Sequence, residues 1–285
     1  MLLITTCCFA PSVFAQKPQD EIACRAERKN NAAYKKKLWD GYEISLGPAR
    51  NSLGGGDDAC TAAIYNQAGK VVFRTTGFNV VFDENVTGQD FDGDGKPEVV
   101  FRTDTGGGNH CCWGYIVFSL YPKPRKLFEI AMEGKVDFER DKQGRMVIWK
   151  RTAGPADFTS MAGQPFAEKV LRVRDGKLVD ATPEFCGRIF SEENEDYRIE
   201  QRVLTPENLK KLQISTGKEI EDEEIVSTLL SRALQYVFCH QYDEALRDLD
   251  QWPEASRKAM KASFAVSIRD DYPEFAAKLG AKPPR

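Results

Sequence analysis

Four carboxylates lie within nine residues of this 285-residue chain, in the segment Asp-Phe-Asp-Gly-Asp-Gly-Lys-Pro-Glu from Asp90 to Glu98. Carboxylates so close together repel one another unless a cation neutralises them. Side chains at alternate positions of a tight loop can all turn toward one ion, and calcium is the cation that best suits such a set of oxygen ligands. The segment therefore predicts a calcium-binding loop around which the flanking elements are arranged.

The spacing follows the first part of an EF-hand calcium loop. That loop takes side-chain oxygens from positions one, three and five, a turn glycine at six and a backbone carbonyl at seven. The glutamate expected at position twelve is replaced by Phe101, so Glu98 is the expected closing ligand. The predicted calcium ligands are Asp90, Asp92, Asp94, the backbone carbonyl of Lys96, and Glu98. The alternative is a solvated acidic turn held by hydrogen bonds from its aspartates.

From Gln89 to Arg102 this pattern resembles the calcium loops of FG-GAP and VCBS repeats. In those repeats the aspartate cluster lies between two β-strands. A Gly-Gly-x-His-Cys-Cys sequence follows at Gly107, and it resembles a pattern of exported bacterial proteins with FG-GAP-like repeats. The resemblance implies an exported protein, but it does not imply an activity.

The two ends and the charge of the chain narrow the class of protein. Forty basic and 43 acidic residues give a net charge of −3, which argues against a nucleic-acid partner. Residues 1–15 are uncharged, mostly apolar and end in Val13-Phe-Ala15, which predicts a signal peptide cleaved before Gln16. We therefore expect a periplasmic or secreted protein with no integral membrane segment after cleavage.

Eight cysteines are present, and the six that follow the expected signal peptide are Cys24, Cys60, Cys111, Cys112, Cys186 and Cys239. An even number of cysteines in an exported chain predicts disulfides. We expect all six to be oxidised, with Cys186 and Cys239 paired because they bracket one helical region. Adjacent residues of a strand face opposite ways, so Cys111 and Cys112 are expected to have different partners, or else to form a vicinal disulfide in a strained turn.

Short strand-like segments dominate the first two thirds of the chain. About ten such segments between Tyr42 and Asp180, with turns such as Asp175-Gly176, predict an antiparallel meander. They are too few for a complete propeller. We therefore expect an α+β protein in which an open, propeller-blade-like or sandwich-like β-domain precedes a small helical domain. The expected divisions are a polar leader at 16–37, the β-domain at 38–182 and the helical domain at 183–285.

Helical periodicity begins after Thr182. Pro206 predicts the start of one helix, and Asp222-Glu-Glu224 the start of another. The second carries a broad apolar stripe from Ile225 to Phe238, which predicts a core-facing helix. From Ser227 to Pro253 the sequence resembles one helical pair of a tetratricopeptide-type repeat, without the full motif.

These features favour a calcium-stabilised binding or scaffolding protein without catalytic activity, whose partner is a protein or a glycan. The sequence contains neither a Gly-x-Ser-x-Gly nor a His-Glu-x-x-His motif. The alternative is a periplasmic metal-assisted hydrolase that uses His110 and nearby carboxylates such as Asp58 and Asp104. Whether His110 and Gly106-Gly-Gly108 are functional or structural stays open at this point.

Overall fold

The structure is a computed structural model that describes residues 22–25, 33–49, 60–104, 113–130, 135–155, 157–160, 163–214 and 223–281. The expected signal peptide lies outside these residues. So do Asp58 and the segment that contains Gly106-Gly-Gly108, His110, Cys111 and Cys112. What the sequence predicts for those residues stays a prediction.

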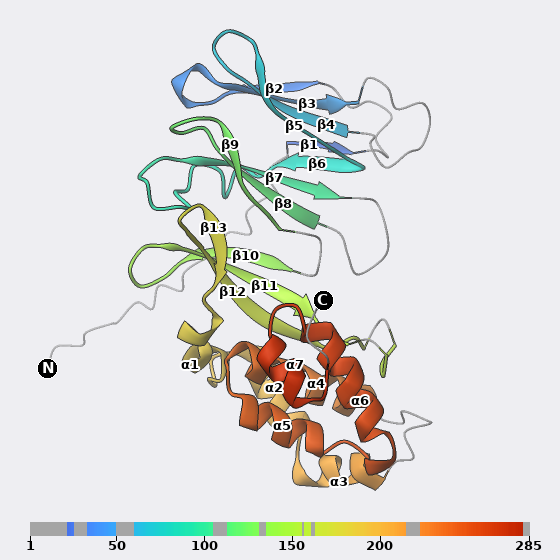
Figure 1. The fold of residues 1–285 in the computed structure, drawn as a ribbon. Coiled ribbons are helices and arrows are strands. Elements are labelled where there is room, and N and C mark those ends of the chain that lie inside the picture. The colour runs from blue at the N-terminus through green and yellow to red at the C-terminus, as the bar shows by residue number, and fades with distance from the viewer. Residues whose placement is uncertain are drawn as a thin grey trace, which may run out of the picture.

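Three antiparallel sheets are stacked one above another, and the helices lie beyond the third (Figure 1). The first sheet has the strand order β2-β3-β4-β5, with bounds Tyr34–Lys37, Glu43–Pro48, Cys60–Tyr65 and Val71–Gly77. The second has the order β1-β6-β7-β8-β9, with bounds Ala23–Arg25, Asn79–Phe82, Glu98–Asp104, Trp113–Ser119 and Arg125–Ile130. The third has the order β10-β11-β12-β13, with bounds Val136–Arg140, Met146–Ala153, Phe166–Arg174 and Lys177–Asp180.

Within the described part of the chain these sheets are open, and none closes into a barrel. The predicted α+β class with an open antiparallel stack is thereby confirmed. The hairpin at Asp175-Gly176 is also confirmed, because β12 and β13 pair directly across it. Both of its residues have positive φ, as such a two-residue turn requires.

The second sheet is buried on both faces, and strand β7 shows why. Val99 and Phe101 belong to the core between the first and second sheets, whereas Val100 belongs to the core between the second and third. All three side chains are fully buried. Alternate residues of a strand face opposite ways, so the part of β7 that lies between the two cores is apolar at three successive positions. Burying each such side chain contributes about 1.5 to 3 kcal/mol.

The polar leader contributes two strands that the sequence pattern did not predict. β1 pairs with β6, and a disulfide joins its Cys24 to Cys60 of β4 in the first sheet. β2 is an edge strand, and its Lys35 and Lys37 are exposed. Lysines are common on edge strands because they hinder pairing with other chains. They also replace the apolar residues whose alternation with polar residues would identify a strand in the sequence.

Two helices of the C-terminal part begin where the sequence predicts, α3 at Pro206 and α4 at Glu223, whereas α1 and α2 were not predicted. The stripe of α4 (Glu223–Phe238) is buried in the helical core, as predicted. The other helices are η1 (Trp39–Gly41), η2 (Thr182–Glu184), α1 (Cys186–Ile189), α2 (Glu195–Val203), α3 (Pro206–Ile214), α5 (Tyr242–Asp250), α6 (Glu254–Ile268) and α7 (Pro273–Lys278). The predicted Cys186–Cys239 disulfide is confirmed, and it joins α1 to the residue after α4.

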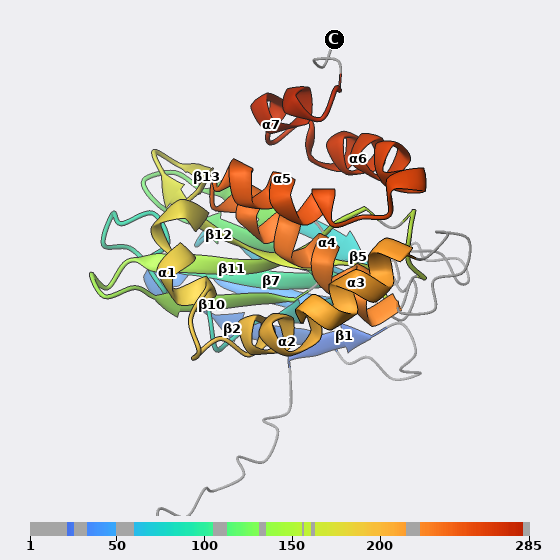
Figure 2. The same ribbon diagram turned by 90° about the horizontal axis from the view of Figure 1, so that it is seen from below.

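The helical part meets the third sheet along the edge of β12 (Figure 2). β13 pairs only with Leu171–Arg174, so none of the described strands lies on the outer side of the first half of β12. Side chains of α4 occupy this side instead. The Phe166 amide donates to the Ser231 hydroxyl at 3.0 Å, and Gln235 bonds both the amide and the carbonyl of Glu168 at 2.8 and 3.0 Å. Pairing these backbone groups fixes α4 against the sheet.

A buried polar cluster lies between α2, α4 and α5. Arg232 forms two hydrogen bonds to Asp248, from Nε at 2.7 Å and from Nη2 at 2.6 Å. Glu200 is buried beside this pair, and its Oε2 has no hydrogen-bond partner within the described structure. Burial raises the pKa of Glu200 to about 8, and the positive charge of Arg232 only partly opposes the shift.

We expect Glu200→Gln to remove a pH dependence of stability. The folded-state pKa of about 8 exceeds the ordinary glutamate value of 4.5, so the folded protein holds a proton that the unfolded chain has lost. The wild-type free energy of unfolding therefore falls as the pH rises from about 5 to about 8, by several kcal/mol. Urea unfolding across this range measures the slope, with the exposed Glu254→Gln as control. Parallel profiles for wild type and Glu200→Gln would contradict this account.

Candidate functional site

The aspartate loop lies between β6 and β7 and is closed by its own hydrogen bonds. Asp90 accepts from the Gly93 amide at 2.7 Å and from the Gly95 amide at 2.9 Å. Asp94 accepts from the Lys96 amide at 2.7 Å. Gly93 and Gly95 have φ values of +80° and +78°, in the region that glycine adopts without strain. These turns bring alternate side chains to one side of the loop.

Phe91 anchors the loop in the protein core. Its side chain packs edge-on against Phe128 of β9 and Phe138 of β10, with ring centroids 5.7 and 5.5 Å apart. Its amide donates to Oε2 of Glu98 at 2.8 Å. Phe91, the apolar residue within the acidic segment, therefore holds the loop against the core and orients the carboxylate of Glu98.

Three of the predicted ligands meet at one point. Asp90, Asp92 and Glu98 each offer a carboxylate oxygen, and these oxygens all lie within 4.8 Å of one another. Glu98 is fully buried, and its Oε1 has no hydrogen-bond partner among the described residues. The cross-strand neighbour Ser119 donates to the Tyr121 carbonyl at 3.0 Å, and its hydroxyl also lies close enough to Glu98 to lower the pKa of that carboxylate. A buried carboxylate oxygen of this kind fits a cation ligand.

The electrostatics of the cluster reflect this crowding. Burial raises the pKa of Glu98 to about 7, the Phe91 amide opposes the shift, and the charge of Asp92 adds to it. Burial and the charge of Asp94 also raise the pKa of Asp92. The guanidinium of Arg125 donates to Asp92 Oδ2 at 3.0 Å and lowers that pKa. The protein thus supplies one positive charge at the edge of a site with excess negative charge.

The two remaining predicted ligands lie in the same loop but outside the trio. The Asp94 carboxylate bonds the Lys96 amide, as described above. The Lys96 ammonium lies over the ring of Tyr121, 5.4 Å from its centroid. Coordination by Asp94 and by the Lys96 carbonyl stays a prediction.

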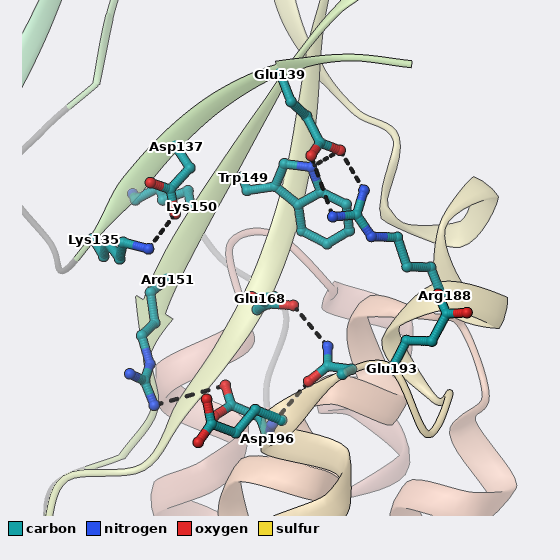
Figure 3. A pocket seen from close by; sticks show the side chains of 12 residues that line it. Lys135, Asp137, Glu139, Trp149, Lys150, Arg151, Glu168, Arg188, Glu193 and Asp196 are labelled. Atoms are coloured by element: carbon teal, nitrogen blue, oxygen red, sulfur yellow. Dashed lines mark hydrogen bonds and ion pairs between the residues drawn. The ribbon is translucent and has the colours of Figure 1, made fainter. Parts of the chain in front are cut away.

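A second candidate site was not anticipated from the sequence. It is a cavity of about 490 Å³ between the outer face of the third sheet and the segment of α1 and α2 (Figure 3). Four basic and six acidic side chains line it together with Trp149 and Asn194. The sequence did not predict the cavity, because Asp137 and Glu139 alternate with Val136 and Phe138 as in a strand with one face in solvent. The sequence gives no sign that helices cover that face.

The strand register explains how the charged side chains gather. Trp149 lies opposite Asp137, and Arg151 lies opposite Glu168, so these four side chains share one face of the sheet. Val147 and Val170 on the same face are buried under α1. This face is therefore apolar under α1 and charged beside it.

No protein-family model, curated protein or solved structure matches the chain. Among the described helices, none has the length and apolar character needed to cross a membrane. The two disulfides among the described residues fit a protein of an oxidising, non-cytoplasmic compartment.

If the aspartate cluster holds calcium, we expect Arg125→Gln to raise the calcium affinity. The guanidinium competes for Asp92 and repels a divalent cation. Removing it should therefore make calcium binding more favourable by about 1 kcal/mol, which is about fivefold in affinity. Calorimetric titration of chelator-stripped protein measures the change. Lys123→Gln is the control, because Lys123 is exposed, lies two residues before Arg125 in the chain, and has no hydrogen bond or ion pair to the cluster among the described residues. Equal affinities for wild type and Arg125→Gln would contradict the role assigned to this guanidinium.

Proposed function

We propose that this chain is an exported, calcium-stabilised binding or scaffolding protein without catalytic activity, acting in the periplasm or outside the cell. The observation that carries the proposal is the fully buried Glu98 carboxylate, which lies in a cluster with Asp90 and Asp92 and whose Oε1 has no hydrogen-bond partner among the described residues. Calcium is bound by oxygen ligands of this kind. In this proposal Asp90, Asp92, Asp94, Glu98 and the Lys96 carbonyl hold the ion.

The position of the loop supports a stabilising role for the ion. Glu98 begins the strand that continues into Val99, Val100 and Phe101, which join the two cores of the β-domain. An ion that neutralises Glu98 would favour the folded state directly. The resemblance to FG-GAP and VCBS loops supports the same reading, because those loops also lie between strands.

Export is supported by the signal-like residues 1–15 and by the oxidised cysteine pairs. With Phe101 in place of a bidentate glutamate, the expected dissociation constant is on the order of 10⁻⁴ to 10⁻³ M, as in extracellular modules. Such a site is filled only where calcium is abundant. A protein or a glycan is the proposed partner.

The test is a thermal melt across a calcium series, on protein first stripped with a chelator and with magnesium as the control ion. At one hundred times the dissociation constant, calcium should add about 2.7 kcal/mol to the free energy of unfolding. Asp92→Ala and Asp94→Ala should remove most of this gain. Lys96→Ala should retain it, because only its backbone carbonyl is assigned to the ion.

A wild-type midpoint that is indifferent to calcium would leave the segment as an acidic turn. A hydrolytic activity that His110→Ala abolishes would favour the hydrolase alternative over a binding protein.

A further inference from the structure

The cavity on the third sheet places charge where a sheet face would ordinarily be apolar. Positions that face a packed helix are normally filled by hydrophobic side chains, as Val147 and Val170 are beneath α1. Beside them, Glu139, Glu168 and Arg151 line an open space of about 490 Å³. This volume is within the range of small-ligand sites. Partly burying carboxylates in this way costs free energy unless a partner compensates for it.

One part of the cavity already holds an organic cation, which is the protein's own Arg188. Its guanidinium donates to both oxygens of Glu139, at 2.5 and 3.2 Å, and lies 4.5 Å from the ring centroid of Trp149 (Figure 3). The Trp149 indole N–H donates to the same Glu139 at 2.6 Å and so fixes it. A carboxylate combined with an aromatic face is a well-suited site for a guanidinium.

The neighbouring carboxylate of Glu168 has no such partner. No described cation forms an ion pair with it, since its cross-strand neighbour Arg151 lies 3.8 Å from Asp196 instead. Its one hydrogen bond from a side chain comes from the Asn194 amide at 3.2 Å. Burial and the charge of Asp196 raise the pKa of Glu168, whereas the Asn194 amide and the charges of Arg151 and Arg188 oppose the shift. The carboxylate therefore has cations nearby, but it forms no direct ion pair among the described residues.

Glu168 is also held in place by the fold. The buried side chain of Gln235 bonds its backbone amide and carbonyl, and Asn194 orients its carboxylate. The exposed Glu193 and Glu195 line the same cavity and add negative charge at its mouth. A preorganised carboxylate with surrounding negative charge favours a cationic ligand.

We propose that this cavity binds an organic cation, an ammonium or guanidinium group, with Glu168 as its counter-ion. The group belongs either to a lysine or arginine side chain of a partner protein or to a free polyamine. The inference rests on the proposed binding function, for which it names the chemistry of the partner. It does not rest on the calcium loop.

The test is calorimetric titration of the full oxidised chain with blocked amino acids. The probes are Nα-acetyl-lysine methylamide and its arginine analogue, with the norleucine analogue as the uncharged control. The cationic probes should bind, and the norleucine probe should not. Spermidine distinguishes the sources, because tighter binding than the lysine probe indicates a free polyamine and weaker binding indicates a protein side chain.

Glu168→Gln keeps the shape of the side chain but removes its charge, and it should weaken binding of the lysine probe about tenfold or more. Glu192→Gln is the matched control, because Glu192 is exposed in the adjacent segment and does not line the cavity. It should bind as wild type does. Equal affinities for wild type and Glu168→Gln, or equal binding of the lysine and norleucine probes, would overturn the proposal.

Arg188→Ala gives a second test that does not alter Glu168. Removing the internal guanidinium frees Glu139 and Trp149, so the affinity for the arginine probe should rise several-fold. An unchanged or lower affinity would count against the assignment of this cavity. If the cationic probes do not bind but calcium still stabilises the protein, only this inference is refuted. If the probes bind but calcium does not stabilise the protein, only the calcium site is refuted.

Discussion

The fully buried carboxylate of Glu98 is the constraint on which the arrangement of the β-domain depends. One of its oxygens accepts the amide of Phe91, and the other has no hydrogen-bond partner among the described residues. The same residue begins β7, whose next three side chains join two cores. A charge here is costly unless a cation shares it. In our proposal calcium supplies that compensation, so ion binding and core packing stabilise the same strand.

The two candidate sites lie on opposite faces of β10. Phe138 faces the second sheet and packs against Phe91 of the aspartate loop. Its neighbours Asp137 and Glu139 face the other way and line the cavity beside α1. The position of α1 is fixed by the disulfide from Cys186 to the end of α4, and α4 in turn caps the edge of β12. The helical part thus completes a cavity that the sheet alone could not form.

Local signals in the sequence were sufficient for most of the elements. Alternation and turn residues placed the strands, as at Asp175-Gly176, and helical spacing placed α4 with its buried stripe. The pairing of Cys186 with Cys239 followed from the helical region between them. Non-local contacts explain the misses. β1 and β2 are short strands that depend on β6 and β3 for pairing, and the cavity depends on which face of the third sheet the helices cover. In the loop, spacing predicted that Asp90, Asp92 and Glu98 lie together, as they do, but it did not predict the burial of Glu98.

The most direct test of the calcium site is a crystal structure of the oxidised chain grown in calcium, with anomalous scattering used to identify the ion. We expect one ion per chain in the aspartate loop, with oxygens of Asp90, Asp92, Asp94 and Glu98 and the Lys96 carbonyl at about 2.3 to 2.6 Å. In that structure both oxygens of Glu98 would have a partner. A loop without an ion at millimolar calcium, with Glu98 Oε1 hydrogen-bonded to water, would contradict the proposed role of this carboxylate.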